Sequence, residues 1–246
     1  MPPPAGDTCP ALHVGAHPIC HERSLGSARD GRRCAITARF EAHVRDFANG
    51  YVAEDPLLTA AREYADELGL ASVSPAAGAA LRLLAAAGAA RAVVEIGTGT
   101  GVSGLWLLRG MRPDGVLTTI DVETEHQRVA RRVFAAAGLA QSRTRIITGR
   151  ARDVLPRLAD GVYDLVFVHH DRLEYAAATV AAARLLRPGG LLVLGDAWGN
   201  GRLTDPTARD PGTVALRDVL KTLRDEDGWL PAFLPTPDGL ACAVRR

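Results

Sequence analysis

Three glycines at alternate positions, Gly97, Gly99 and Gly101, follow an apolar run at 92–96 and precede a helix-like pattern. Glycine lets the backbone turn sharply and lets a ligand lie against the main chain. A strand that enters such a turn and leaves it as a helix is typical of sites that bind nucleotides or nucleosides. The pattern alone is shared with nicotinamide- and flavin-binding folds, so it does not identify the cofactor.

Two acidic residues narrow the choice of cofactor. Glu95 lies two residues before the first glycine, where its carboxylate would oppose a pyrophosphate. S-adenosylmethionine carries an ammonium and a sulfonium but no phosphate, so a fixed anion near the turn favours it; alternatively, Glu95 only binds local backbone amides. Asp121 ends the next apolar run, about 20 residues after the turn, where a carboxylate can accept hydrogen bonds from ribose hydroxyls. Glu95 therefore indicates the methyl donor, and Asp121 the adenosine.

The elements around these residues alternate between strands and helices. Apolar runs that predict strands lie at 92–96, 116–120, 145–148, 162–168 and 191–194. Helical patterns lie near 102–111, 124–137, 152–159, 172–186 and 207–225. The second of these helices begins with a capping box from Thr124 to Gln127. Strands that are apolar throughout and separated by helices predict a parallel sheet covered on both faces.

The end of the chain differs, because segments 229–234 and 240–244 predict an antiparallel hairpin. The whole pattern predicts an α/β fold with a mostly parallel, Rossmann-like sheet and helices on both faces. Five parallel strands followed by a terminal hairpin resemble the seven-stranded sheet of class I methyltransferases. Residues 36–246 form this domain, with a helical cap at 36–90 (helices near 38–50, 56–69 and 75–87) and the core at 91–246. Residues 1–35 are rich in Pro and Gly and are predicted to be a disordered tail, whose His and Cys residues lack the paired spacing of a zinc site.

Composition argues against several classes of partner. The formal net charge is +1 and charges of both signs are interspersed, which speaks against nucleic acid. No apolar stretch reaches the ~20 residues that cross a bilayer, and the N-terminus lacks the pattern of a secretory signal. The four cysteines make no disulfide framework for the core, which favours the cytoplasm.

On these residues the chain resembles small O-methyltransferases related to the catechol and caffeoyl-CoA O-methyltransferases, especially bacterial members. The similarity runs from about residue 52 to the C-terminus, and its most specific segments are 73–75, 93–108, 117–122, 149–158 and 163–175. The resemblance implies S-adenosylmethionine as cofactor, a small-molecule hydroxyl as acceptor (phenolic or catecholic by analogy) and a homodimer. It also implies the cofactor contacts Val73, Glu95, Gly97, Thr98, Ser103, Asp121 and Val122, with Ala151 and Arg152 beside the adenine and Asp171 as a further contact.

The catalytic half departs from that family. Its metal-dependent members use an Asp that ends the fourth strand and an Asp-Asn pair after the fifth, where this chain has His169 and Asp196-Ala197. Magnesium prefers near-octahedral oxygen coordination, and a softer ion would find only two ligands, so no metal site is predicted. The position of the lysine base in catechol methyltransferases is Arg172, which stays protonated and cannot take a proton.

His169 and His170 are therefore the predicted replacements for the base, with Asp196 as a third catalytic residue, because imidazole titrates near neutral pH. Alternatively, one histidine stacks on adenine and the other packs at the sheet edge. Trp198 and the glycines at 199 and 201 form either a mobile aromatic wall of the acceptor site or ordinary packing.

Other functions stay open at this point. The incomplete metal triad leaves a protein that binds the cofactor without turnover as one alternative. A nicotinamide-dependent oxidoreductase is another, although Glu95 and the terminal hairpin speak against it and no Tyr-x-x-x-Lys pair is present. A methyltransferase for nucleobase nitrogens is disfavoured, because the Pro-Pro-Tyr signature expected after the fourth strand is absent.

Overall fold

The computed structural model describes residues 41–246, of which Ala42–Arg246 form one compact unit. The predicted tail at 1–35, with its His and Cys residues, lies outside the described residues. So does the beginning of the helix predicted near 38–50, whose described part, 41–50, is helical. Within the described part of the chain, no helix is both long enough and apolar enough to span a membrane.

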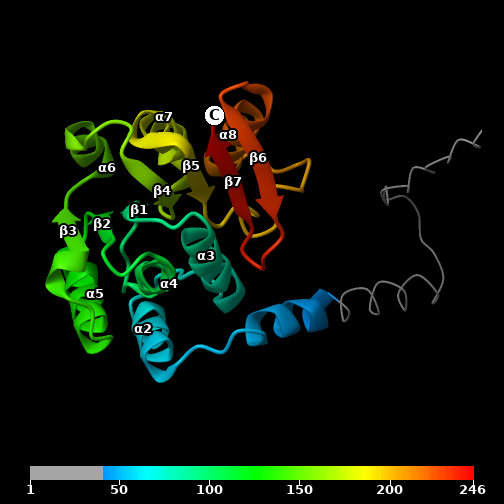
Figure 1. Ribbon diagram of the computed structural model, residues 1–246. Coiled ribbons are helices and arrows are strands. Elements are labelled where there is room, and N and C mark those ends of the chain that lie inside the picture. The colour runs from blue at the N-terminus through cyan, green and yellow to red at the C-terminus, as the bar shows by residue number, and fades with distance from the viewer. Residues whose placement is uncertain (1–40) are drawn as a thin grey trace, which may run out of the picture. The chain divides into compact units, whose positions relative to one another are not determined.

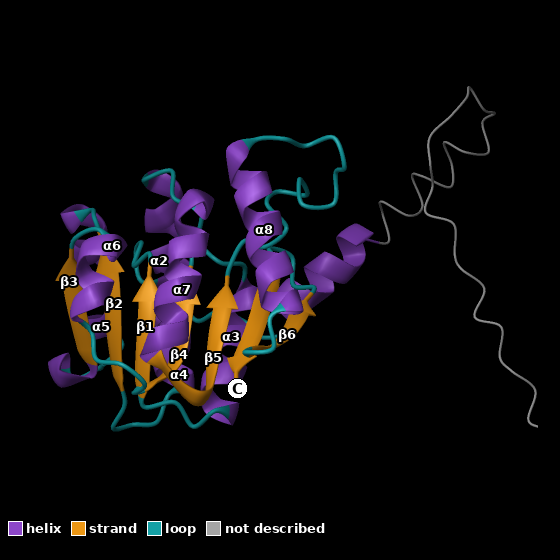
Figure 2. Cartoon of the chain, turned by 90° about the horizontal axis from the view of Figure 1, so that it is seen from above, coloured by secondary structure: helices purple, strands orange, loops and turns teal. Residues whose placement is uncertain are grey.

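The sheet has seven strands in the order β3-β2-β1-β4-β5-β7-β6 (Figures 1 and 2). The first five strands along the chain pair in parallel, and β7 runs antiparallel to both of its neighbours. This confirms the predicted mostly parallel sheet with a terminal hairpin. The strands are β1 (Ala92–Ile96), β2 (Val116–Asp121), β3 (Thr144–Thr148), β4 (Tyr163–Val168), β5 (Leu186–Leu194), β6 (Trp229–Leu234) and β7 (Leu240–Arg245).

Helices cover both faces of the sheet, as predicted (Figure 1). Alternate residues of a strand point to opposite faces, so Leu165 and Phe167 of β4 join one core cluster and Val166 and Val168 the other. The first face packs against α2 (Pro56–Glu67), α3 (Pro75–Ala87), α4 (Val102–Gly110) and α5 (Thr124–Ala136). The second packs against α6 (Ala151–Val154), α7 (Tyr175–Leu185) and α8 (Pro211–Asp225).

Capping side chains set where two of these helices begin. Ser74 accepts a hydrogen bond from the backbone N–H of Ala77 at 3.2 Å, and Pro75 takes the first helical position, so α3 begins where the sequence predicts. The last helix begins at Pro211 rather than near 207, because Asp210 caps it.

The capping box predicted for α5 is wrong. No side chain caps this helix, and the Gln127 amide donates instead to the Ile147 carbonyl at 2.7 Å. The Gln127 carbonyl oxygen accepts from the Thr148 hydroxyl at 2.6 Å. A buried amide gains more from satisfying strand groups than from an exposed helix end, so Gln127 fastens α5 to β3.

The five parallel strands end at one edge of the sheet, where the loops that follow them gather. Two further segments reach this edge. The carboxylate of Asp238, in the turn between β6 and β7, accepts from the backbone N–H of Ser74 at 2.5 Å. The Gly239 carbonyl accepts from the backbone N–H of Ala197 at 3.0 Å. The hairpin therefore joins the beginning of α3 to the loop after β5.

Candidate cofactor and acceptor site

A cavity of about 610 Å³ lies at the carboxyl edge of the sheet, a size that suits a small-molecule ligand. It is lined by most of the predicted cofactor residues: Val73, Gly97, Thr98, Gly99, Ser103, Asp121, Val122, Ala151 and Arg152. It is also lined by the predicted catalytic residues His169, His170 and Asp196. Three predicted cofactor residues lie outside the lining, namely Glu95, Gly101 and Asp171.

The glycine turn between β1 and α4 needs its glycines for different reasons. Gly97 has φ +98°, and a Cβ there would lie 2.1 Å from the carbonyl oxygen of His169. Gly99 has φ +50° and would meet nothing, so its open side leaves room for a ligand. Gly101 packs against α5, where a Cβ would lie 3.1 Å from Ala130. Gly101 therefore shapes the turn without lining the cavity.

Glu95 lies beneath the turn and is not among the residues that line the cavity, so its contact with the cofactor stays a prediction. Its side chain is completely buried, since strand alternation turns it toward α4. One carboxylate oxygen accepts from the Ser103 hydroxyl at 2.7 Å and the other from the Thr119 hydroxyl at 2.6 Å. Burial raises the pKa of Glu95 to about 7. Both Glu95 carboxylate oxygens therefore accept from side-chain hydroxyls. They do not bind backbone amides, as the alternative interpretation expected.

Asp121 connects the ends of two strands at the cavity wall. One of its oxygens accepts from the backbone N–H of Gly99 at 2.9 Å, and the other from that of Glu123 at 3.0 Å. His126 Nδ1 lies 3.6 Å from the second oxygen. A carboxylate oxygen has two lone pairs, so Asp121 keeps acceptor capacity for hydroxyl groups in the cavity.

His169 lines the cavity at the end of β4 and is held on three sides. Its backbone N–H donates to the Ile96 carbonyl at 2.9 Å, and its ring stacks on Phe167 with 5.9 Å between centroids. A Cβ on Gly195 would lie 2.7 Å from the His169 ring. Desolvation lowers the pKa of His169, although Asp196 and Asp238 partly oppose the shift. The imidazole is therefore neutral near pH 7 and able to accept a proton.

His170 is engaged differently. Its Nε2 lies 3.1 Å from a Glu174 carboxylate oxygen, and its ring stacks on Tyr175 at 5.8 Å. Its Nδ1 is buried and has no hydrogen-bond partner among the described residues. His170 lines the cavity, but the nitrogen that pairs with Glu174 is already occupied.

Asp196 lines the cavity in the loop after β5 and is paired with Arg172, whose Nη2 donates to one carboxylate oxygen. The next residue, Ala197, is buried and offers no ligand. A divalent metal does not fit these residues. The one carboxylate, Asp196, is already paired with Arg172, and the other two positions offer the imidazole of His169 and the methyl group of Ala197. Within residues 41–246, no group of three His, Cys, Asp or Glu side chains could hold a metal ion.

Asp171 is not among the residues that line the cavity, and its contact with the cofactor stays a prediction. Its carboxylate accepts from the backbone N–H of Leu173 at 3.0 Å and caps the short 3₁₀ turn Arg172–Glu174. A short Asp side chain just before a turn competes for local amides in this way. The residue thus helps to aim Arg172 and Glu174.

Sequence reasoning missed Asp238, which it treated only as part of a Pro-Asp-Gly turn. Its carboxylate binds the backbone N–H of Ser74, next to the cavity residue Val73, and its carbonyl accepts from the backbone N–H of Trp198 at 3.1 Å. Burial raises the pKa of Asp238. The pairing spans 164 positions of the chain, so no local pattern could have revealed it.

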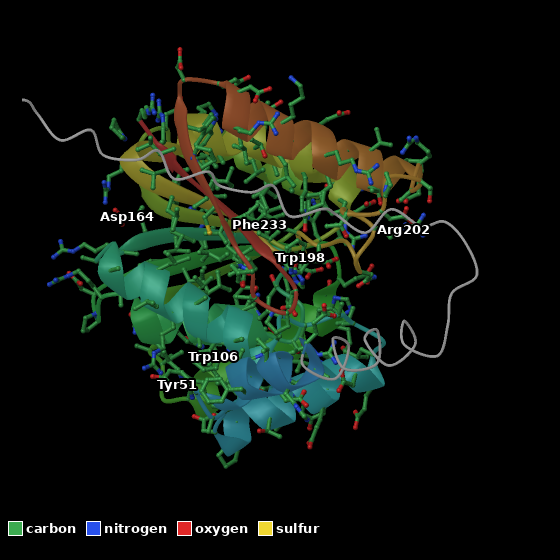
Figure 3. All side chains as sticks on the ribbon, turned by 90° about the vertical axis from the view of Figure 1, so that its right-hand side faces the viewer. Tyr51, Trp106, Asp164, Trp198, Arg202 and Phe233 are labelled. Atoms are coloured by element: carbon green, nitrogen blue, oxygen red, sulfur yellow. The ribbon has the colours of Figure 1, made fainter. Side chains whose placement is uncertain are left out.

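Trp198 is a packing residue. Its indole N–H donates to the Thr236 carbonyl at 2.8 Å, and its ring lies 4.5 Å from that of Phe233 at an angle of 51°. Figure 3 shows the two labelled rings side by side where the hairpin meets the loop after β5. Of the two interpretations of Trp198, these contacts favour packing over a mobile wall.

Comparison with known proteins adds three findings. The model of the O-methyltransferase family matches residues 51–246. A probable O-methyltransferase of Mycobacterium tuberculosis strain H37Rv is 50% identical over 198 residues, which cover 80% of this chain and 88% of that protein. A similar protein of Mycolicibacterium smegmatis is 50% identical over 194 residues, covering 79% of this chain and 92% of that one.

Solved structures agree with these matches. A Corynebacterium glutamicum protein is 36% identical with a TM-score of 0.77, covering 84% of this chain and 97% of its own. The O-methyltransferase TomG of Streptomyces achromogenes, solved in complex with S-adenosylmethionine, is 32% identical with a TM-score of 0.73, covering 81% and 93%. An O-methyltransferase of Bacillus cereus in complex with S-adenosylhomocysteine is 26% identical with a TM-score of 0.74, covering 83% and 97%.

Proposed function

Because this chain belongs to the O-methyltransferase family, we propose that it methylates a hydroxyl group of a small molecule, without the metal site of the family's metal-dependent members. The protein is an S-adenosylmethionine-dependent methyltransferase with a class I fold. Family membership excludes the nicotinamide-dependent alternative. One observation carries the finer proposal: the glycine turn, His169 and Asp196 line the same cavity.

The cofactor end of the cavity offers the groups that the nucleoside needs. S-adenosylmethionine supplies, when bound, a sulfonium methyl group that an acceptor oxygen displaces in line while the sulfur keeps the bonding electron pair. In our proposal the Asp121 carboxylate accepts from the ribose hydroxyls, and the bare backbone at Gly99 lets the ligand approach closely. Ala151 and Arg152 flank the adenine, and Val73 lies against the remainder of the cofactor.

At the acceptor end, His169 takes the proton of the acceptor hydroxyl. Three observations support this role: the ring lines the cavity, its position is fixed by Phe167 and Gly195, and its lowered pKa keeps the imidazole neutral near pH 7. His170 is a weaker candidate because the ring nitrogen that Glu174 leaves free, Nδ1, is buried. Phenols and catechols are the proposed acceptors, by analogy with the family.

The experiment compares His169→Ala with His170→Ala in turnover of S-adenosylmethionine with a panel of simple phenols and catechols. Loss of a general base lowers kcat by about 10²–10⁴, so His169→Ala should show that loss and His170→Ala a smaller one. Calorimetric titration with S-adenosylhomocysteine should give similar affinities for both variants. If His169→Ala turns over as fast as the parent protein, the base assignment is wrong. If no acceptor is methylated although the cofactor binds, the small-molecule proposal fails.

We also propose a homodimer, following the family, and a cytoplasmic location, because the four cysteines form no disulfide framework in the sequence. An exposed apolar patch on and after the helix at 41–50 supports the second copy: Val44, Phe47 and Tyr51 are 52%, 72% and 77% exposed. Tyr51 is labelled at the surface in Figure 3. Sedimentation of the full chain that returns a monomer at micromolar concentration would contradict the dimer.

A further inference from the structure

An ion pair stands at the acceptor end of the cavity. Arg172 Nη2 donates to Asp196 Oδ2, and the two side chains are only 21% and 29% exposed, so solvent screens the pair weakly. The guanidinium lies beside the turn after β5, where a Cβ on Gly199 would be 3.8 Å from Arg172 Nε. Among the described residues, Asp196 is the only group to which this guanidinium donates.

The backbone fixes the direction of Asp196. Its φ is +46°, in the left-handed region that non-glycine residues rarely adopt. Hydrogen bonds hold the residues on both sides: Gly195 N–H donates to the Val168 carbonyl at 2.8 Å, and Ala197 N–H to the Gly239 carbonyl at 3.0 Å. An unfavourable backbone conformation that persists at a cavity wall points to a constraint at that position.

Arg172 is fixed from its own side as well. It is the first residue of the 3₁₀ turn that Asp171 caps, in the loop after β4. Its Cβ lies near the beginning of α8, 3.8 Å from where a Cβ on Gly212 would be. The two partners thus come from loops after neighbouring strands, β4 and β5, and meet where those loops converge.

From this geometry we propose that the Arg172 guanidinium replaces the divalent metal: it holds Asp196 in place and offsets its charge, so that an acceptor oxygen ionises beside a neutral pair. In a site with two carboxylates, a divalent cation leaves the local charge near zero, and here one carboxylate and one guanidinium do the same. Asp196 alone would repel an ionising oxygen. Arg172 is a positioning residue, because it acts through Asp196. The inference rests on the proposed function, since it assigns a role in the same acceptor site.

The same pair excludes a metal ion. A divalent cation that used Asp196 as a ligand would lie within a few ångströms of the guanidinium and be repelled by it. The imidazole of His169 and the methyl group of Ala197 do not complete an oxygen shell. Restoring the oxygen ligands should therefore not be enough to restore a metal site while Arg172 is present.

The test is a calorimetric titration of the full chain with Mn²⁺ in three forms: the parent protein, the double variant His169→Asp/Ala197→Asn, and the triple variant that adds Arg172→Met. We expect no saturable binding by the parent protein. The triple variant, with three oxygen ligands and no guanidinium, should bind at least about tenfold more tightly than the double variant. Stoichiometric Mn²⁺ binding by the parent protein, or equal affinities of the double and triple variants, would overturn the proposal.

A second experiment measures the kinetics of single substitutions at Arg172, so the proposal can still be tested if the double and triple variants fold poorly. Arg172→Met should lower kcat by about tenfold or more with little change in the KM of S-adenosylmethionine, and Arg172→Lys should recover part of the loss because it keeps the charge. Equal rates for Met and Lys at this position, or a parent protein that loses activity in a chelator, would contradict the role. Titration of the parent protein with S-adenosylhomocysteine distinguishes failure of this inference from failure of the proposed function. If the parent protein does not bind S-adenosylhomocysteine, the proposed function is wrong. If it binds both S-adenosylhomocysteine and Mn²⁺, only the role of Arg172 is wrong.

Discussion

Glu95 shows how a single buried residue can support a site from beneath the turn that lines it. Its carboxylate joins Ser103 of α4 to Thr119 of β2 beneath the glycine turn, and the Thr119 hydroxyl also lies 2.7 Å from that of Thr98. The chain therefore uses a buried acid to connect strand, turn and helix. Such a group makes the stability of the turn sensitive to pH.

The pH dependence follows from the sign of the shift. Burial raises the pKa of Glu95 from 4.5 to about 7, so the folded state prefers the protonated acid and its stabilising contribution is lost as pH rises from about 4.5 through 7. The change amounts to about 3 kcal/mol at most. Glu95→Gln, a neutral isostere, should remove this contribution, so urea unfolding at pH 5 and pH 8 should show a smaller loss of stability for the variant. Equal losses in the two proteins would show that Glu95 does not titrate in this range.

For single residues, the sequence predicted which residues belong to the site better than it predicted where their side chains point. Gly97, Gly99 and Asp121 could be placed at the cavity because the strand–turn–helix pattern fixes their geometry. The orientation of the Glu95 side chain could not be predicted. The apolar run shows which residues form the strand, but it does not show which face of the strand packs against the buried helix α4. The local role of Asp171 was not foreseen either, because the pattern does not tell whether a short acidic side chain binds a ligand or caps a local turn.

The turn between β1 and α4 is the element on which the cavity depends. Gly97 combines φ +98° with a Cβ position 2.1 Å from the His169 carbonyl oxygen, which brings the ends of β1 and β4 into direct backbone contact. Gly99 has φ +50° but open space around it. Both glycines therefore have a positive φ, but only Gly97 is enclosed by other backbone atoms.

Gly97→Ala should cost several times more stability than Gly99→Ala. The first change adds a backbone clash to the strained φ, whereas the second pays only the cost of a left-handed non-glycine residue, about 1–2 kcal/mol. Urea denaturation of both variants measures the difference in the free energy of unfolding. Calorimetry with S-adenosylhomocysteine shows whether each variant still binds the cofactor product. Similar losses for the two variants would show that the contact with His169 does not limit the turn.

Element boundaries were predictable where local chemistry sets them. Ser74 and Pro75 begin α3 as the sequence indicates, because both act on the first turn of their own helix. The capping box of α5 was wrong because Gln127 serves the ends of distant strands instead. Local patterns fail where a side chain gains more from a partner far along the chain.

For the whole molecule, the alternation of strands and helices predicted the sheet, its two covered faces and the edge that carries the site. A parallel sheet brings the carboxyl ends of its strands together, so residues at the ends of β1, β2, β3, β4 and β5 could be assigned to one cavity before any contact was known. The connection between the terminal hairpin and α3 could not be predicted, because it depends on a hydrogen bond between Ser74 and Asp238, which are 164 positions apart.

That connection yields a prediction about the complete fold. Asp238 holds the beginning of α3 next to Val73, which lines the cofactor cavity, so loss of its carboxylate should loosen a cavity wall from a distance. Asp238→Ala leaves the Ser74 N–H without its partner, at a cost of about 1–3 kcal/mol, and should weaken S-adenosylhomocysteine binding by about tenfold. Asp238→Asn keeps an acceptor oxygen and should retain most of the affinity. Calorimetry of the two variants decides the matter: if Asp238→Ala binds as tightly as Asp238→Asn, the hairpin does not support the cofactor site, and its role is confined to closing the sheet.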